Sequence, residues 1–264
     1  SVAIPKSAVA LAALKKSLTV SYLPMGETEA LKIAAYRETE EYVHVPRQFG
    51  ISYCLQHGIE LDDETSQGQP AVFPRVPAPR SYQVEPLKSI ADCFQQFYDF
   101  IFRARTGWGK TIGSLIAASR LGRTTLIVVD QENLKDQWME SLVQHFGFKA
   151  SDVGIIQGKK CTYEGKAVTI AMVQTLTQRR LPQEVYDYFG TVIVDEVHVI
   201  GAPTFSTVLF DFSAAWRIGV SATPKRKDAL QKLITCHLGQ VRVFVEDEHE
   251  ESAVYVMTHG TTYS

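Results

Sequence analysis

Residues 104–111 read Ala104-Arg-Thr-Gly-Trp-Gly-Lys-Thr111 and lie between two different kinds of sequence. The preceding Phe100-Ile-Phe102 is typical of a buried strand, and Lys110 to Leu121, closed by Gly122, has helical spacing. A Gly-rich turn from a strand into a helix favours phosphate binding, because glycines let backbone N–H groups converge on phosphate oxygens. The dipole of the following helix strengthens such an anion site. The stretch therefore predicts a nucleotide site on an α/β fold.

The side chains of this loop predict how the nucleotide is held. We expect Lys110 to reach the β- and γ-phosphates and the Thr111 hydroxyl to ligate Mg²⁺. The first glycine of the general phosphate-loop pattern is replaced by Ala104. The predicted nucleotide-binding residues of the loop are Thr106, Gly107, Trp108, Gly109, Lys110 and Thr111.

The sequence around the loop predicts the rest of the sheet. Leu126-Ile-Val-Val129 and Val192-Ile-Val194 carry no polar alternation, which is typical of parallel strands covered on both faces. The expected fold class is α/β, a doubly wound parallel sheet. Further expected elements are a helix from Asn133 to Phe146 closed by Gly147, a last strand Arg217–Val220, and a helix from Lys227 to Leu238.

Two acids follow one of these strands, in Thr191-Val-Ile-Val-Asp-Glu-Val-His198. A carboxylate at the carboxyl end of a parallel strand lies where such sheets bind ligands. We expect Asp195 to hold the Mg²⁺ shell and Glu196 to polarise the attacking water, so Asp195, Glu196 and Lys110 are the predicted catalytic residues. Taken alone, two acids at a strand end are more often a helix cap, and His198 and Ser221-Ala-Thr-Pro224 are equally ambiguous.

The first 78 residues differ from the rest and predict a small α+β domain. A domain boundary is expected near residue 78, because Gly58 to Pro79 is polar and rich in proline, which keeps a linker extended. The elements expected before it are a short helix over Ser7–Lys16, a strand over Leu18–Leu23, a helix over Glu27–Glu38 and a strand over Tyr42–Val45.

Composition excludes several classes of protein. The 264 residues include 27 Lys and Arg and 29 Asp and Glu, which gives a net charge of −2. This charge excludes a nucleic-acid-binding protein whose whole surface is basic, but it does not exclude a local basic groove. No apolar run reaches the roughly 18 residues that span a bilayer, so no membrane association is expected. The four cysteines form no CxxC pair, and a chain this large favours reduced thiols and a cytoplasmic location.

It is the ordered set of motifs that resembles a known family. In chain order, these motifs are Gln83, residues 104–111, Asp195-Glu-Val-His198 and Ser221-Ala-Thr223. Together they resemble the first motor domain of a superfamily 2 (DExH-type) helicase or translocase over about residues 79–240. The resemblance implies a RecA-like fold, ATP with Mg²⁺, and adenine recognition by Gln83 with help from Arg80. It also implies that His198, Ser221 and Thr223 couple hydrolysis to nucleic-acid movement. The family's loop commonly begins with Ala, which accounts for Ala104.

The nucleic-acid contacts implied by the resemblance are less clear. Asp130 to Trp138 occupies the place of one strand-contacting motif, and Ala171-Met-Val-Gln-Thr175 resembles another. The residues expected to contact nucleic acid are Gln174, Thr175, Arg179 and Arg180. Three basic clusters each follow a predicted strand: Lys159-Lys160, Arg179-Arg180 and Lys225-Arg-Lys227. Their shared place at the carboxyl edge of the sheet suggests a groove that binds the phosphates of a nucleic acid. We expect Trp108 to be partly exposed near the nucleotide, and Trp138 and Trp216 to lie in the core.

Two stretches suggest DNA as the partner. Ser221 to Asp228 looks closer to DNA-acting branches in repair, recombination, branch migration and restriction, and Tyr42 to Gly50 resembles a segment of phage and large-virus helicases. We therefore expect an ATP-dependent motor that acts on single-stranded, forked or branched DNA. An RNA helicase and a non-catalytic DNA-docking module stay open as alternatives, whereas a P-loop kinase would not need Gln83 or the Ser221 motif.

The length after Thr223, about 40 residues, is too short for a second motor domain. Because ATP in this superfamily lies between two motor domains, we expect the chain to be a fragment in which residues 241–264 begin the linker. Such a fragment is expected to bind ATP weakly and to hydrolyse it slowly.

Overall fold

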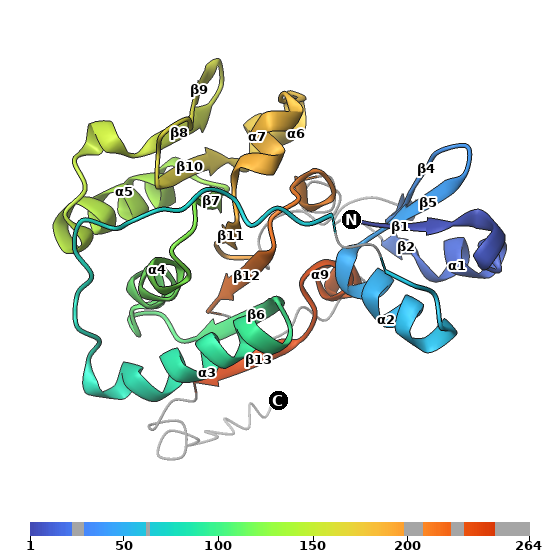
Figure 1. The fold of residues 1–264 in the computed structure, drawn as a ribbon, viewed down its shortest axis with the longest axis horizontal. Helices are drawn as coiled ribbons and strands as arrows, with labels where there is room; N and C mark the ends of the chain where they lie inside the picture. The colour runs from blue at the N-terminus through green and yellow to red at the C-terminus, as the bar shows by residue number, and fades with distance from the viewer. Residues whose placement is uncertain (23–28, 62–63, 198–207, 223–229, 246–264) are drawn as a thin grey trace, which may run out of the picture.

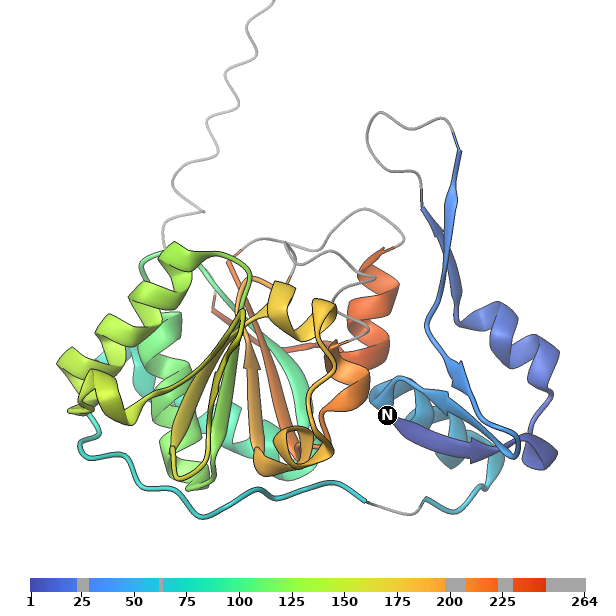
Figure 2. The ribbon, with the colours of Figure 1, turned by 90° about the horizontal axis from the view of Figure 1, so that it is seen from above.

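The computed structural model describes residues 1–22, 29–61, 64–197, 208–222 and 230–245. It consists of a large α/β domain and a smaller N-terminal α+β domain beside it (Figure 1). Viewed from above, the strands of the α/β domain stand between two layers of helices (Figure 2). The expected fold class, a doubly wound parallel sheet preceded by a small α+β domain, is confirmed.

The central sheet has eight strands in the order β13-β6-β12-β11-β7-β10-β8-β9. Neighbouring strands are parallel except for β8 and β9, which form an antiparallel hairpin. The strands are β6 Asp99–Ala104, β7 Thr125–Val129, β8 Gly154–Gln157, β9 Lys160–Thr162, β10 Val168–Met172, β11 Thr191–Val194, β12 Trp216–Ser221 and β13 Val241–Val245.

Apolar runs without alternation form this sheet because both of its faces are buried. In β7, Ile127 and Val129 join one apolar cluster, while Leu126 and Val128 join the cluster on the other face. The first cluster is covered by α3 Val84–Gln96, α4 Lys110–Leu121 and α5 Glu132–Phe146. The second is covered by α6 Val173–Gln178, α7 Gln183–Tyr188 and α9 Leu230–Leu238. Short 3₁₀ turns lie at Lys6–Ala8, Ser81–Gln83 and Ala150–Asp152.

The helices confirm the predicted stop signals. Helix α4 ends at Gly122 and α5 ends at Gly147, and both glycines adopt the left-handed backbone conformation. Helix α3 and strand β13 were not predicted. The last helix is described from Leu230, so the expected residues 227–229 lie outside the described part of the chain.

The N-terminal domain contradicts one prediction. The helix expected over Glu27–Glu38 is wrong, because its described part forms two strands instead. There β3 pairs with β2, and these cross-strand contacts outweigh the local helical spacing. The other expected strand, β5, is present, and the expected first helix begins only at Leu11. The elements are β1 Val2–Pro5, α1 Leu11–Ser17, β2 Thr19–Tyr22, β3 Leu31–Ala34, β4 Arg37–Glu38, β5 Tyr42–Val45 and α2 Arg47–His57.

The described part of segment 58–79 contains no helix and only isolated bridges, and it runs extended along one edge of the α/β domain (Figure 2). It is nevertheless attached to that domain. The backbone N–H of Ala71 donates to Gly122 O, and that of Arg75 donates to Phe146 O. Phe73 is buried against Phe146 and Phe148. The burial of Phe73 therefore holds this proline-rich segment against the α/β domain. Residues 58–79 are called the strap below.

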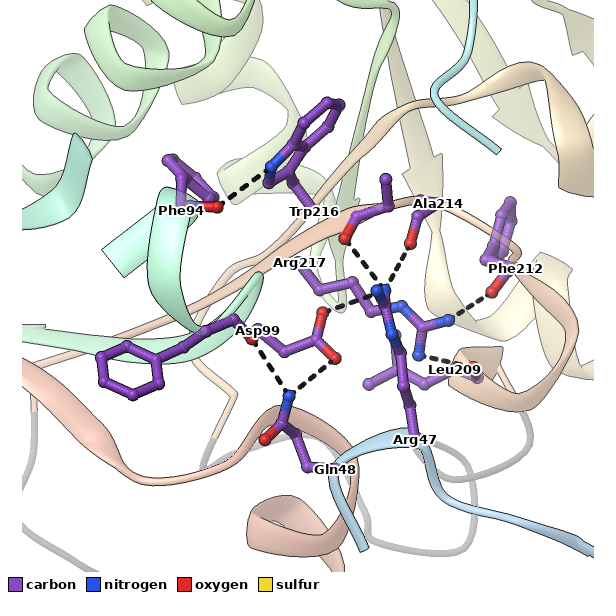
Figure 3. Close-up of polar contacts among 11 residues, drawn as sticks. Arg47, Gln48, Phe94, Asp99, Leu209, Phe212, Ala214, Trp216 and Arg217 are labelled. Carbon is purple, nitrogen blue, oxygen red and sulfur yellow. Dashed lines mark hydrogen bonds and ion pairs between the residues drawn. The ribbon is translucent and has the colours of Figure 1, made fainter. Parts of the chain in front are cut away.

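A buried polar cluster joins the two domains (Figure 3). From α2, Arg47 Nη1 donates to the carbonyl oxygens of Ala214 and Ala215, both at 2.9 Å, and lies 3.3 Å from Asp99 Oδ1. Gln48 Nε2 donates to Asp99 Oδ2 at 3.3 Å. Arg217 lies beside them and donates to two further carbonyl oxygens, and burial lowers its pKa to about 10. Asp99 begins β6 and Arg217 lies near the start of β12. This group of side chains, called the docking cluster below, therefore lies at the amino edge of the sheet, where the parallel strands begin.

Helix α9 contains a histidine that makes stability depend on pH. His237 is fully buried beside Phe210, and burial, with Arg217 and Arg37 nearby, lowers its pKa well below 6.5. Below pH 6.5 the unfolded chain therefore binds a proton that the folded chain does not, so folding loses stability as the pH falls. We expect this group to lower the free energy of unfolding by up to about 1.4 kcal/mol per pH unit there.

Urea unfolding at pH 7.5, 6.5 and 5.5 measures this slope in the unmodified chain and in His237→Gln. The variant is expected to show a smaller slope, whereas His57→Gln, at an exposed histidine, keeps the original one. An equal slope in His237→Gln and the unmodified chain would contradict this assignment.

Candidate nucleotide-binding site

The turn between β6 and α4 has the backbone conformation that its glycines permit. Gly107 and Gly109 have φ of 83° and 92°, in the left-handed region where other residues are strained. A Cβ at Gly109 would lie only 2.8 Å from Gln83 Nε2, while one at Gly107 would meet no atom within 4 Å. The turn therefore brings bare backbone to the start of α4, which is the arrangement that binds phosphate.

The sheet order brings the other predicted residues to the same edge. Strands β6, β12 and β11 are adjacent and parallel, so their carboxyl ends lie side by side. Ser221 pairs in register with Arg103, just before the loop, and it is buried. Asp195 and Glu196 directly follow β11. The loop, both acids and Ser221 thus share one edge, opposite the docking cluster.

Asp195 is held by two hydrogen bonds. It is 6% exposed, and burial raises the pKa of its carboxyl group. The indole Nε1–H of Trp138 donates to Asp195 Oδ2 at 2.7 Å, and the backbone N–H of Glu196 donates to Oδ1 at 2.9 Å. These bonds favour the charged form and oppose the effect of burial. A buried carboxylate in this position suits a cation.

Glu196 has an unusual backbone. Its φ of 42° is one of two positive values among the non-glycine residues in the described part of the chain. Such a conformation costs about 1–3 kcal/mol and persists only where the surroundings enforce it. Glu196 Oε2 accepts a hydrogen bond from the backbone N–H of Ala222 at 3.5 Å, which connects the end of β11 to the end of β12. The side chain is partly exposed and so accessible to water.

Lys110 begins α4 and faces these acids. Its Nζ donates to Arg105 O at 3.4 Å, and burial lowers the pKa of its ammonium group, whereas Glu196 and Asp195 raise it. A half-buried cation that interacts with two carboxylates at the end of a Gly-rich turn suits a metal–phosphate ligand. Thr111 is partly exposed on the first turn of α4.

Gln83 contacts the loop from the turn before α3. It is buried, its Nε2 donates to Trp108 O at 3.1 Å, and its Oε1 accepts from Arg80 N at 3.0 Å. Arg80 Nη1 in turn donates to Tyr82 Oη at 2.9 Å. The structure therefore brings Gln83 and Arg80 beside the phosphate loop.

The structure corrects the expected burial of two tryptophans, Trp108 and Trp216. Trp108 is not partly exposed: its ring is 4% exposed and packs on Phe102 and Gly113 in the core. Only its backbone lines the loop, because the bulky ring has turned inward. Trp138 is buried, as expected, but its contact with Asp195 was missed, and no spacing in the sequence indicates a bond across 57 positions. Trp216 is only partly buried.

The residues expected to contact nucleic acid lie farther along the same edge, after β10. Thr175 is buried and its Oγ1 accepts from Gly158 N at 2.8 Å. Gln174 Nε2 donates to Asp130 O at 2.5 Å, and Arg179 Nη1 donates to the carbonyl oxygens of Gly158 and Lys159. Arg180 is exposed. His198, Thr223 and the cluster Lys225-Arg-Lys227 lie outside the described residues.

The residues that would hold Mg²⁺ are Thr111 and Asp195. Within the described ranges, no three His, Cys, Asp or Glu side chains are grouped to hold a metal by themselves. The buried carboxylate of Asp195 suits a metal that is shared with the phosphates of a nucleotide. No helix in the described part of the chain is long and apolar enough to cross a membrane.

Comparison with known proteins agrees with this geometry. The model of the family described as "Type III restriction enzyme, res subunit" matches residues 77–226. A protein of Acanthamoeba polyphaga mimivirus named as an ATP-dependent RNA helicase is 34% identical over 156 residues, which are 59% of this chain and 30% of that protein. Helicase D10 of Escherichia phage T5 is 34% identical over 139 residues, 53% of this chain and 30% of the relative. The chain thus spans about a third of the length of these relatives.

Solved structures share the fold. The UvsW helicase from bacteriophage T4 has a TM-score of 0.58 and 16% identity, covering 88% of this chain and 92% of that chain. The Sulfolobus solfataricus SWI2/SNF2 ATPase core in complex with dsDNA has a TM-score of 0.54 and 18% identity, covering 65% of this chain and 37% of the other. These likenesses confirm the expected RecA-like fold.

Proposed function

Because this chain belongs to the type III restriction enzyme res subunit family and contains the first motor domain of a superfamily 2 helicase related to phage and viral helicases, we propose that it drives movement on, or remodelling of, forked and branched DNA. Helicase-family function and ATP use follow from the relatives. The observation that supports ATP hydrolysis in this proposal is the meeting of the Gly107–Gly109 turn, Lys110 and the Asp195–Glu196 pair at one sheet edge.

The proposed mechanism follows from this geometry. The backbone of the turn and the Lys110 ammonium group bind the nucleotide phosphates, and Gln83 with Arg80 places the base beside the loop. Thr111 and Asp195 would hold Mg²⁺, which would neutralise phosphate charge. Glu196, partly exposed and fixed by Ala222 N–H, orients the attacking water. Positioning and charge neutralisation are what phosphoryl transfer requires.

The bond from Ala222 N–H to Glu196 supports a coupling role for the Ser221 motif. A shift of residues 221–222 would move the carboxylate that orients water. His198 and Thr223 are proposed to act in the same step. Gln174, Thr175, Arg179 and Arg180 are proposed to follow the nucleic-acid backbone with contacts that carry no sequence information.

We further propose a domain organisation and a location. Residues 1–78 form the accessory domain with its strap, and residues 79–240 form motor domain 1. Strand β13 Val241–Val245 also belongs to motor domain 1, because it pairs with β6 in the central sheet, so the expected linker to a second motor domain begins after residue 245. That second domain would contribute arginines to the transition state, an effect worth about 10³–10⁵ in rate in comparable enzymes. The four cysteines are free thiols, which supports a cytoplasmic location.

The test is steady-state ATP hydrolysis by the full-length protein, alone and with single-stranded, duplex or forked DNA or with RNA. Forked DNA is expected to stimulate hydrolysis by roughly tenfold or more, which corresponds to an activation barrier lower by about 1.4 kcal/mol. Lys110→Ala should abolish hydrolysis under every condition and serves as the control for contaminating ATPases. Equal rates with and without DNA would refute the proposal.

A specific observation favours RNA as the second candidate. The mimivirus relative is named as an ATP-dependent RNA helicase, as are relatives from African swine fever virus. Stimulation by RNA alone in the same assay would establish that candidate instead.

A further inference from the structure

Trp138 contacts the proposed metal-holding acid from a different layer of the fold. It lies in the middle of α5, is 1% exposed, and its Nε1–H donates to Asp195 Oδ2 at 2.7 Å. With Asp195 Oδ1 occupied by the backbone N–H of Glu196, both carboxylate oxygens have a fixed donor. The side chain of Asp195 is therefore set in one orientation by a helix on one side and a turn on the other.

This contact does more than satisfy a buried indole N–H. A backbone carbonyl can accept from an indole N–H, as Phe94 O does from the partly buried Trp216 at 3.2 Å. Trp108 Nε1 has no hydrogen-bond partner in the described part of the chain. Trp138 instead directs its donor at a carboxylate, where a hydrogen bond is shorter and about twice as strong as one between neutral groups.

Helix α5 is also attached to the strand ends beside the residues proposed to bind nucleic acid. Near its start, Glu132 Oε1 accepts from Gln157 Nε2 at 2.7 Å, and Lys135 Nζ donates to Gln157 Oε1 at 3.1 Å. Gln157 ends β8 and is followed by Gly158, whose N–H donates to Thr175 and whose carbonyl accepts from Arg179. A continuous series of polar contacts thus leads from Arg179 to the helix that carries Trp138.

We propose that Trp138 is a positioning residue that orients the Asp195 carboxylate for Mg²⁺ and connects this site, through α5 and Gln157, to the nucleic-acid side of the sheet edge. The proposal rests on the function proposed above. It assigns no chemical step to Trp138, which acts only through the acid that it holds.

The test is the dissociation constant of ATP, measured by titration calorimetry with and without Mg²⁺ on the full-length protein. Trp138→Phe keeps an aromatic ring and removes the donor. It is expected to weaken Mg²⁺-dependent ATP binding by roughly 10- to 100-fold, as loss of a metal ligand's hydrogen-bond partner typically does. ATP binding without Mg²⁺ should not change. The matched control is Trp216→Phe, which also removes an indole donor but lies at the amino edge, and it should leave both constants unchanged.

A double-mutant cycle separates positioning from packing. In an Asp195→Ala background, Trp138→Phe should add no further loss of Mg²⁺-dependent binding, because the carboxylate to be oriented is gone. A loss of the same size in both backgrounds would overturn the proposal. If Trp138→Phe does not fold, the indole N–H resonances of the unmodified protein give the answer. Mg²⁺ added with ATP should shift the Trp138 signal more than that of Trp216, and equal shifts would refute the proposal.

Lys110→Ala distinguishes the two possible failures. If it binds ATP as tightly as the unmodified protein, the proposed function itself is wrong. If Lys110→Ala loses ATP binding while Trp138→Phe behaves as the unmodified protein, only the role of Trp138 is refuted.

Discussion

Glu196→Gln is expected to leave ATP binding intact while lowering the rate of hydrolysis by about 10²–10⁴-fold, the usual contribution of a general base. The amide keeps the shape of the side chain and can still accept the hydrogen bond from Ala222 N–H. It cannot take a proton from water. The measurement is a pair of experiments on the full-length protein, ATP affinity by calorimetry and steady-state hydrolysis with forked DNA.

Two variants delimit this prediction. Glu85→Gln removes an acid that is exposed on α3 and paired with Lys88, so its rate should match the unmodified protein. Lys110→Ala should lose both binding and hydrolysis, which separates failure to bind from failure to react. A Glu196→Gln variant with undiminished turnover would show that another group orients the water.

Asp99→Ala is expected to reduce the free energy of unfolding by about 3–5 kcal/mol, because it leaves buried guanidinium groups without their carboxylate. Asp99 is 1% exposed, and Arg47 and Arg217 beside it are buried. Burial raises the pKa of Asp99, while the two arginines oppose that effect. Urea unfolding of the 264-residue chain at pH 7.5 measures the loss.

The matched control is Glu85→Ala, which removes the acid of an exposed pair and should change stability by no more than about 1 kcal/mol. A loss in Asp99→Ala as small as that in Glu85→Ala would mean that the docking cluster is not what holds the N-terminal domain to the motor.

The strongly patterned parts of the fold could be predicted from the sequence. Leu126-Ile-Val-Val129 reads as a strand buried on both faces, and Gly122 and Gly147 mark the ends of α4 and α5, because these signals are local. The helix predicted over 27–38 was wrong because pairing with β2 is a tertiary contact that no local pattern reports. Strand β13 was missed for a similar reason, since its edge position leaves Phe244 exposed and weakens the apolar pattern.

The candidate site was predictable as a set of residues but not as an arrangement. The motifs name Lys110, Asp195 and Ser221, yet only the sheet order shows that their strands are adjacent. The indole of Trp108 turns inward and packs where Gly113 has no side chain, which its place in the loop does not reveal. The bond between Trp138 and Asp195 depends on how α5 packs on the sheet, so its prediction requires the packed structure.

The strand order has a consequence for synthesis on the ribosome. Strand β6, which leads into the phosphate loop, lies between β12 and β13, which come last in the chain among the described strands of this sheet. The nascent chain must therefore carry Phe100, Ile101 and Phe102 without either neighbour strand until residues beyond 216 have emerged. Such an unpaired apolar segment is a target for chaperones and a hazard for aggregation. Co-translational folding of the nucleotide site is consequently a late event, completed from the carboxyl-terminal side of the domain.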